Sequence, residues 1–130
     1  MDRERPAGGR ILVVDDHENL CWVLERVLSE RGHVVRTAQT GAQAIRVASD
    51  FDCQVAIVDY RLPDTTGIGL AALLKSRRPG LRAIFMTSYG SAALREEVMS
   101  GGFFAYFGKP FVNADLIAAV EAAILEPVTP

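Results

Sequence analysis

The sequence predicts a doubly wound α/β domain, in which helices cover both faces of a parallel sheet. Its 130 residues suit one domain. Five short apolar runs are almost continuous, which is typical of strands buried on both faces of a parallel sheet. A helical pattern follows each run, and strict alternation favours parallel strands joined by right-handed crossovers.

The predicted strands are rich in β-branched and aromatic residues, which suit a buried pleated surface. In chain order they cover residues 11–14, 34–37, 55–58, 83–86 and 103–107. No apolar run approaches the roughly 20 residues that span a bilayer, so we expect no membrane association.

The first two helices are predicted from apolar spacing and from their end signals. Gly32 stands where a glycine commonly ends a helix. Thr40 and Gln43 form a capping-box pattern that opens the second helix. The stripe of the first helix follows i, i+3, i+4, i+7 and i+8 spacing, at Leu20, Val23, Leu24, Val27 and Leu28.

The last three helices are predicted in the same way. The third ends before Pro79 and the fourth at Gly101. Asn113 is predicted to cap the fifth helix, and Pro127 to end it. The apolar positions of the three are Leu70, Leu73, Leu74, Leu94, Val98, Leu116, Ile117, Val120 and Ile124.

Five strands in this alternation suit the flavodoxin-like (βα)5 sheet, with strand order 2-1-3-4-5. We expect residues 1–9 to form a flexible tail and residues 10–126 to form the domain. Residues 127–130 look like the start of a linker or tail, with a C-terminal effector domain beyond it in a longer parent protein.

The charge and the cysteines exclude several kinds of partner. A net charge of −2 argues against nucleic-acid binding by this domain alone, which requires a basic face. The basic run at residues 75–78 is interpreted as the solvated end of a helix. Cys21 and Cys53 lack a disulfide framework or zinc-ligand spacing, so we expect reduced thiols in a cytoplasmic protein. His33 is predicted to lie on the surface.

Polar side chains interrupt the apolar pattern where strands end. Asp15 and Asp16 follow the first strand, Asp59 ends the third, Thr87 ends the fourth and Lys109 follows the fifth. Open parallel sheets bind ligands at the carboxyl ends of their strands, where the strand order reverses. That point lies between strands one and three, so we expect the three carboxylates to meet.

This set of residues indicates phosphoryl chemistry. Three carboxylates repel one another, and a hard divalent cation such as Mg²⁺, or Mn²⁺, relieves the repulsion. Lys109 and the Thr87 hydroxyl suit an anion beside that cation. Phosphoryl transfer needs an acceptor oxygen, a metal ion and a cationic clamp, and a carboxylate can be the acceptor. His17 borders the acidic pair and is interpreted as peripheral to the site.

These residues lie in motifs that resemble the receiver domains of two-component response regulators. The motifs are ILVVDD at 11–16, VDYRLP at 58–63 with Gly67, MTSYG at 86–90 and YFGKPF at 106–111. The resemblance covers about residues 10–126. The departures are Gly102, where alanine is usual, and Ala105, where an acidic residue often precedes the aromatic one.

The resemblance implies a role for each acidic position. Asp59 would accept the phosphoryl group from a phosphohistidine of a sensor histidine kinase, or from a small phosphodonor. Asp16, Asp59 and the backbone carbonyl of Arg61 would bind Mg²⁺. Asp15 would act on the ion directly or through water.

The resemblance also implies a signalling output. Lys109 would pair with the phosphoryl oxygens, and its bond to Pro110 would be cis. Thr87 and Tyr106 would form a switch that changes a protein-interaction surface, for homodimerisation or for docking of an effector domain. The chemistry would be limited to Mg²⁺-dependent self-phosphorylation and self-dephosphorylation, so the domain is not expected to be an enzyme.

Three other functions fit part of the pattern. A haloacid-dehalogenase-type phosphatase needs an acid where Arg61 stands, and the length leaves no room for a cap domain. The string GIGLAA at 67–72 matches a dinucleotide motif, but it follows the third strand and lacks the acidic residue that would bind ribose. A receiver fold that never accepts phosphate stays open, and failure of every phosphodonor to modify Asp59 would favour it.

Overall fold

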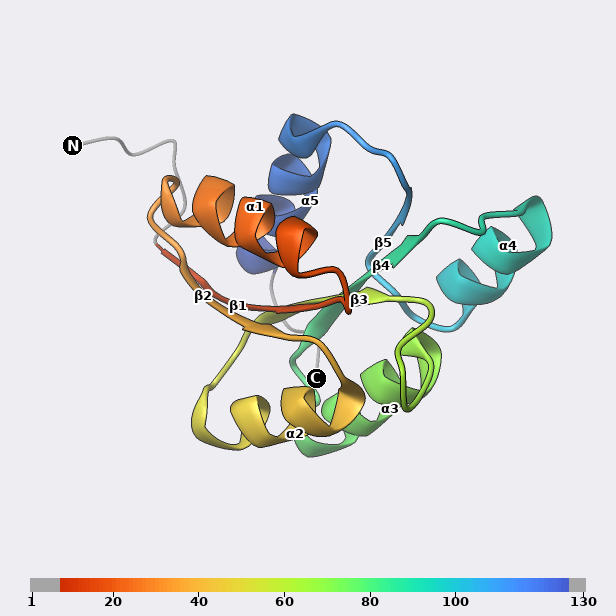
Figure 1. The fold of residues 1–130 in the computed structure, drawn as a ribbon, viewed down its shortest axis with the longest axis horizontal. Coiled ribbons are helices and arrows are strands. Elements are labelled where there is room, and N and C mark those ends of the chain that lie inside the picture. Colours follow the sequence, from red (N-terminus) through yellow and green to blue (C-terminus); the bar gives the residue numbers. More distant parts are fainter. Residues whose placement is uncertain (1–7, 127–130) are drawn as a thin grey trace.

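The computed structural model describes residues 8–126 and shows the predicted alternation of strands and helices (Figure 1). Its strands form one parallel five-stranded sheet in the order β2-β1-β3-β4-β5, which confirms the predicted fold class. The strands are β1 (Arg10–Val14), β2 (Val34–Ala38), β3 (Val55–Asp59), β4 (Arg82–Thr87) and β5 (Ala105–Gly108).

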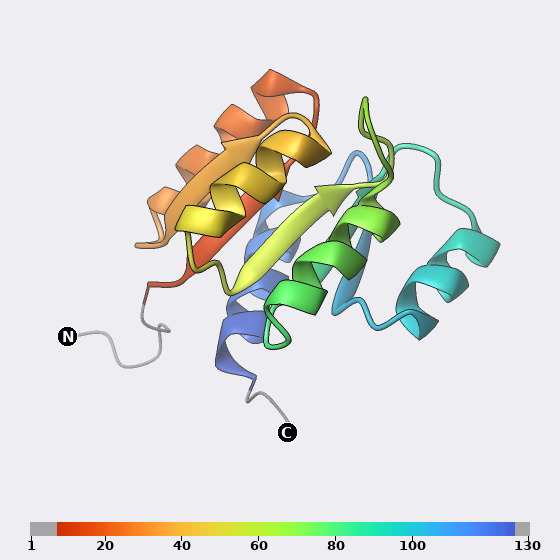
Figure 2. The same cartoon turned by 90° about the horizontal axis from the view of Figure 1, so that it is seen from below.

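The helices lie on both faces of this sheet (Figures 1 and 2). One layer contains α1 and α5. The opposite layer contains α2, α3 and α4, and α4 also packs against β5. No helix among the described residues is long and apolar enough to cross a membrane. Their bounds are α1 (Glu18–Ser29), α2 (Gly41–Asp50), α3 (Gly67–Arg77), α4 (Ala92–Ser100) and α5 (Asn113–Leu125).

The two layers explain why the strand sequences are apolar without a break. Side chains alternate between the faces of a strand. Along β1, Ile11 and Val13 therefore pack under α1 and α5, whereas Leu12 and Val14 pack against α2 and α3. All four are fully buried, so an apolar residue is needed at every position.

The predicted C-terminal end of α1 and the predicted start of α2 are confirmed. Gly32 has a φ of +93°, the left-handed conformation that glycine adopts after a helix. The Thr40 hydroxyl accepts a hydrogen bond from the Gln43 N–H at 3.0 Å. The Gln43 side chain accepts from the Gln39 N–H at 2.8 Å, one residue earlier than in a standard capping box.

Two predicted starts are wrong. The fifth strand begins at Ala105, because Phe103 packs edge-on against Phe85 at 5.3 Å and belongs to the turn after α4. Asn113 is the first residue of α5 rather than its cap, and its side chain makes no capping bond. Val112 is the cap residue, and its carbonyl already accepts from the Asp115 and Leu116 N–H groups.

The prediction that His33 lies on the surface is also wrong. Its ring is buried, with Nδ1 accepting from the Gly9 N–H and Nε2 facing Glu121, both at 2.9 Å. Glu121 on α5 binds Arg31 as well, at 2.6 and 2.9 Å. These partners offset the cost of burying a polar ring.

Residues 1–7 and 127–130 lie outside the described part of the chain, with most of the predicted tail, the predicted linker and Pro127. Gly9, which we assigned to the tail, accepts a hydrogen bond from the Val34 N–H beside β2. Cys21 and Cys53 are both free and buried. The domain boundaries stay a prediction.

Candidate functional site

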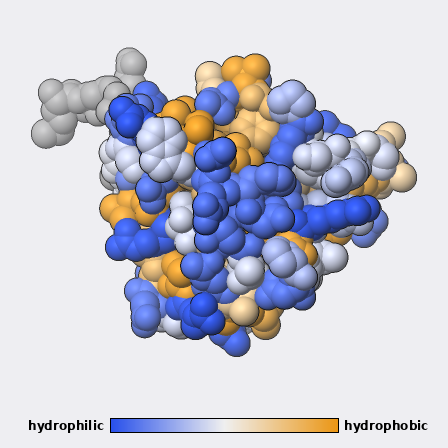
Figure 3. Space-filling model, viewed as in Figure 1, coloured by the Kyte–Doolittle hydropathy of each residue, from blue (hydrophilic) through white to orange (hydrophobic). Residues whose placement is uncertain are grey.

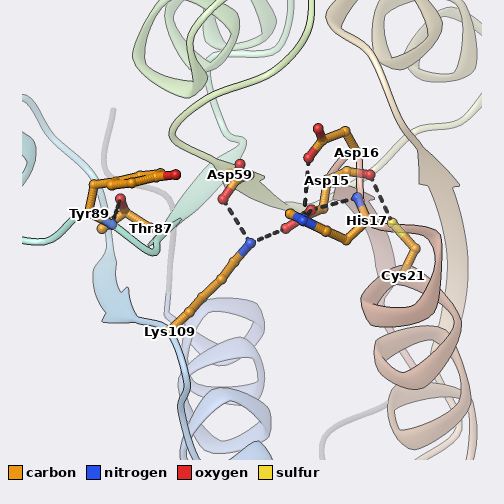
Figure 4. Close-up of polar contacts among 8 residues, drawn as sticks. All are labelled: Asp15, Asp16, His17, Cys21, Asp59, Thr87, Tyr89 and Lys109. Atoms are coloured by element: carbon orange, nitrogen blue, oxygen red, sulfur yellow. Dashed lines mark hydrogen bonds and ion pairs between the residues drawn. The ribbon is translucent and has the colours of Figure 1, made fainter.

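The carboxyl ends of four strands bring the predicted polar residues to one edge of the sheet (Figure 4). The register of β1 and β3 pairs Val14 with Val58, so Asp15 and Asp59 follow at adjacent positions. Thr87 ends β4, and Lys109 follows β5. The surface over these strand ends is mainly hydrophilic (Figure 3).

Lys109 joins the two buried aspartates. Its Nζ lies 2.5 Å from Asp15 Oδ2 and 2.9 Å from Asp59 Oδ1. The backbone N–H of Lys109 donates to the Thr87 carbonyl at 2.7 Å, which fixes the start of the loop. The peptide bond to Pro110 is cis, as predicted.

Burial, hydrogen bonds and nearby charges shift the pKa values of both Asp59 and Lys109. Burial raises the pKa of Asp59, the hydrogen bond from Lys109 opposes this, and the charge of Asp15 adds to it. Burial alone would lower the pKa of Lys109, but its hydrogen bonds to Asp15 and Asp59 outweigh burial and raise the pKa. The lysine therefore stays charged, and two carboxylates share one ammonium group.

Asp16 and His17 lie beside Asp15 in the turn after β1. Asp15 is fully buried, whereas Asp16 is exposed. The His17 Nδ1 atom lies 3.0 Å from Asp15 Oδ1 and 3.4 Å from Asp16 Oδ1. The potential ligand atoms of the three residues all lie within 4.8 Å of one another. His17, interpreted above as peripheral, thus contacts both carboxylates.

A cavity of about 240 Å³ opens over Asp59. Asp59 and Lys109 line it together with Asp16, His17 and Arg61. Larger hollows of about 370 and 400 Å³ lie at the opposite end of the sheet, around Cys53. None of the predicted site residues lines those two. A more open hollow of about 690 Å³ is lined by Asp16 and His17 but not by Asp59 or Lys109, so the chemistry points to the smaller cavity, which Asp16, Asp59 and Lys109 line together.

The rim of this cavity includes a contact that sequence reasoning missed. The Arg61 guanidinium lies over the Tyr89 ring, 4.5 Å from its centroid, and 5.9 Å from that of Tyr60. Tyr89 is exposed, and the attraction of a cation for an aromatic face holds it toward the β3–α3 loop. The two residues are 28 positions apart, and no sequence signal joins them.

Thr87 is buried at the end of β4. Its hydroxyl oxygen accepts a hydrogen bond from the Tyr89 N–H at 2.9 Å. A hydroxyl can accept and donate at once, so its hydrogen can still be donated to a further acceptor. Thr87 therefore holds the start of the loop that leads to α4, and Ser88 and Tyr89 of that loop line the cavity.

Tyr106, the second residue of the expected switch, is half-buried on β5. Its ring stacks on Phe85 at 5.7 Å, and its hydroxyl is buried without a hydrogen-bond partner in the described part of the chain. Gly90 makes this possible, because a Cβ there would lie 2.6 Å from the hydroxyl oxygen. The Arg95 guanidinium of α4 covers the ring, 5.5 Å from its centroid.

Cys21 is a neighbour of the site without a chemical role in it. Its thiol donates to the Asp15 carbonyl at 3.3 Å, a contact shown in Figure 4. Burial, and after it the charge of Asp15, raises the pKa of the thiol to about 11. A thiol with this pKa is a poor nucleophile at neutral pH.

Known proteins are similar to this chain in sequence and in fold. The DNA-binding transcriptional regulator NtrC of Escherichia coli is 34% identical over 116 residues, which are 89% of this chain and 25% of that protein. A response regulator of Burkholderia pseudomallei, solved with a phosphorylated aspartic acid, a calcium ion and citrate, is 29% identical with a TM-score of 0.80. The match covers 89% of this chain and 68% of that one.

A further solved structure is the beryllofluoride-activated receiver domain dimer of NtrC4, with 27% identity and a TM-score of 0.83. The match covers 88% of this chain and 95% of that one. The sequence profile of the response regulator receiver domain matches residues 11–121. With that match over most of its length, and with the sheet order and strand-end residues described above, the chain belongs to the response regulator receiver domain family.

Proposed function

We propose that this receiver domain accepts a phosphoryl group on Asp59 with the help of a divalent cation, and signals through Thr87 and Tyr106. The observation that carries the proposal is the bridge from Lys109 to Asp15 and Asp59 on the wall of one open cavity. It joins an acceptor oxygen and a cationic clamp, two of the parts that phosphoryl transfer needs, and a second carboxylate that can help to hold the third, the metal ion.

The donor atoms fit a hard divalent cation. Receiver domains bind Mg²⁺ through acidic residues. The carboxylates of Asp15 and Asp16 lie in one group of possible ligand atoms, and Asp59 lines the same cavity as Asp16, so the three offer oxygen ligands. Asp16, Asp59 and the Arg61 backbone carbonyl would hold the ion, which is Mg²⁺ or Mn²⁺, with Asp15 acting directly or through water. When bound, the ion supplies positive charge that offsets the charge of the phosphoryl oxygens.

Asp59 is the nucleophile. One of its carboxylate oxygens forms the new bond to phosphorus while the bond from phosphorus to the donor breaks. For a phosphohistidine donor, the imidazole nitrogen keeps the bonding electron pair. Lys109 is placed to pair with the transferred oxygens, and the Thr87 hydroxyl can donate to one of them while it still accepts from Tyr89.

The partners follow from the relatives. The chain spans about a quarter of the length of NtrC, 25%, so a sensor histidine kinase as donor and an effector domain as output are proposals for this protein. The dimeric state of the activated NtrC4 receiver domain supports a homodimer on phosphorylation. The rest of the parent gene would show which effector follows.

A small acyl phosphate is expected to add one phosphate to Asp59 when Mg²⁺ is present. Hydroxylamine should remove it, because an acyl phosphate reacts with this nucleophile and a phosphoserine does not. Intact mass and peptide mapping measure both results. Asp59→Asn should take no phosphate, while Asp50→Asn, an exposed aspartate on α2, should behave as the parent.

A phosphate on Thr87 or Ser88 contradicts this mechanism. No adduct with any donor would favour a receiver fold that only binds partners. Sustained turnover of a phosphate ester would instead support the phosphatase alternative.

Lys109→Ala should separate metal binding from phosphorylation. The variant loses the ammonium group that neutralises Asp15 and Asp59, so Mg²⁺ should still bind while phosphorylation or its consequence is impaired. Calorimetry measures the metal affinity, and intact mass measures the phosphate. Asp16→Asn and Asp59→Asn should each weaken Mg²⁺ binding. Unchanged affinity in both would contradict the cation site.

A further inference from the structure

We propose that His17 is a ligand of the divalent cation and gives this site a preference for Mn²⁺ and Co²⁺ over Mg²⁺. This inference rests on the proposed function, because it concerns the same cation site. It goes beyond that function because it names a nitrogen ligand. It also names the class of ion that this receiver domain selects.

The spacing of the ligand atoms is the first observation. Ions of this size bind nitrogen and oxygen at about 2.1 Å, so two neighbouring ligand atoms lie about 3 Å apart. The His17 Nδ1 atom lies 3.0 Å from Asp15 Oδ1 and 3.4 Å from Asp16 Oδ1. The three side chains thus have the spacing of ligands around one ion (Figure 4).

The second observation is the cavity that His17 shares with the phospho-acceptor. Asp16, His17 and Asp59 line the same space of about 240 Å³. The imidazole is therefore on the wall of the cavity where phosphorylation is proposed. An ion bound between Asp16 and Asp59 would have the ring beside it.

The third observation is the position of His17 at the start of α1. Residues at this position usually accept a hydrogen bond from the helix with a short side chain. His17 makes no such bond, and its ring turns toward the carboxylates instead. Its backbone N–H donates to Asp15 Oδ1 at 2.9 Å, which fixes the turn that presents the ring.

The chemistry of the ligands then predicts the ion. Mg²⁺ keeps oxygen ligands and several waters, whereas imidazole suits later first-row ions, whose affinity rises from Mn²⁺ to Co²⁺ and Ni²⁺. The side chain is 70% exposed, so it can turn a ring nitrogen to an ion without repacking the core. The alternative role of His17 is that its ring only donates a hydrogen bond to the carboxylates and occupies the place of the cation. It predicts that removal of the ring strengthens Mg²⁺ binding.

The test is calorimetry of the whole chain with MgCl₂, MnCl₂ and CoCl₂ at neutral pH. His17→Ala should lower the affinity for Mn²⁺ and Co²⁺ about tenfold or more and leave that for Mg²⁺ within about twofold. Glu18→Gln is the matched control, since it removes a charge next to His17 and should change all three affinities alike. Circular dichroism checks that the variants are folded.

A second readout reports ligation itself. In the Co²⁺ form, an imidazole bound to the ion should give a proton resonance far outside the usual NMR range. This resonance should disappear in His17→Ala and stay in Glu18→Gln. Its absence from the parent protein overturns the inference.

The calorimetry separates this inference from the proposed function. If Asp59→Asn weakens the binding of all three ions and His17→Ala changes the three affinities alike, only the role of His17 is wrong. A gain in Mg²⁺ affinity in His17→Ala likewise overturns it. If Asp59→Asn changes none of the affinities, the cation site of the proposed function fails.

Discussion

Glu121 shows how one side chain joins distant parts of the chain. Its carboxylate binds Arg31, which follows α1, and His33, which precedes β2. The Arg31 hydrogen bond is the largest cause of the lowered pKa of Glu121; burial opposes it, and the His33 hydrogen bond adds to it. The charged form of Glu121 therefore stabilises the fold.

Glu121→Gln should remove a pH-dependent part of the stability. A carboxyl with a lowered pKa in the folded state stabilises it above the unfolded pKa of 4.5, and the effect is lost as pH falls through the folded value. At pH 7 the variant should lose about 2 kcal/mol of unfolding free energy, typical of hydrogen bonds to a charged group. Denaturant unfolding at pH 7 and pH 3 measures it.

The loss should be smaller at the acidic pH, where the parent carboxyl is protonated too. Glu30→Gln is the control, because Glu30 is exposed and its nitrogen partner on Arg26 is 3.9 Å away. An equal loss for Glu121→Gln at both pH values would contradict the role of its charge.

Single residues were predictable where a rule of the fold places them. Asp15, Asp59, Thr87 and Lys109 were found from the sequence because strands of a parallel sheet present their carboxyl ends at one edge. The partners of His33 were not, because Glu121 lies 88 positions away and no local pattern joins the two.

At the scale of elements, the β3–α3 loop is tied to the start of α2. Asp64 accepts from the Gly41 and Ala42 N–H groups at 2.8 and 2.9 Å, where the positive end of a helix dipole favours a carboxylate. A Cβ on Gly41 would lie 2.5 Å from a methyl carbon of Thr65, so the loop packs directly on the helix. The same loop carries Arg61, whose carbonyl is a proposed ligand.

Asp64→Ala should therefore weaken Mg²⁺ binding, although Asp64 is not itself a proposed ligand. Loss of a residue that orients ligands costs tenfold or more in many metal sites, and at this exposed loop we expect about tenfold or less. Asp64→Asn keeps one acceptor oxygen and should lie between the parent and Asp64→Ala. Calorimetry gives the affinity.

Amide exchange gives an independent measure, because the Gly41 and Ala42 N–H groups should exchange faster in Asp64→Ala. Asp115→Ala, in the first turn of α5, is the matched control. Faster exchange with unchanged Mg²⁺ affinity would show that the tether stabilises α2 only.

The order and type of the helices and strands could be predicted from the sequence. Their first and last residues were less predictable. Continuous apolar runs and helical spacing reflect burial on both faces, which is a property of the whole sheet. Ends depend on particular contacts. Phe103 extends an apolar run because it packs on Phe85, and Val112 starts α5 through its backbone carbonyl.

At the scale of the molecule, the site lies at one edge of the sheet, and a chain of contacts leads from it to α4. Thr87 holds the Tyr89 N–H, and the next residue, Gly90, lies against the Tyr106 hydroxyl. Tyr106 in turn lies under Arg95 of α4. A movement of Thr87 toward a phosphoryl group would thus shift the packing between β5 and α4.

The last prediction concerns this route from Asp59 to the surface formed by α4, β5 and α5. Met99 on α4 and Val112 before α5 are exposed apolar side chains. With beryllofluoride and Mg²⁺ as a phosphoryl mimic, light scattering should show a dimer of the parent protein. Thr87→Ala should stay monomeric, because it lacks the hydroxyl that we propose donates to the anion.

The Tyr106→Phe variant tests whether the packing of the ring, rather than its hydroxyl, carries the signal to the surface. The hydroxyl has no hydrogen-bond partner among the described residues, and burying it unpaired costs about 1 kcal/mol or more. The variant should therefore be at least as stable as the parent and should dimerise with the mimic, because the ring still fills the space between Phe85 and Arg95. Tyr106→Ala empties that space and should lose dimerisation. If Tyr106→Phe fails to dimerise while Thr87→Ala behaves as the parent, the signal depends on the hydroxyl and reaches the surface by another route.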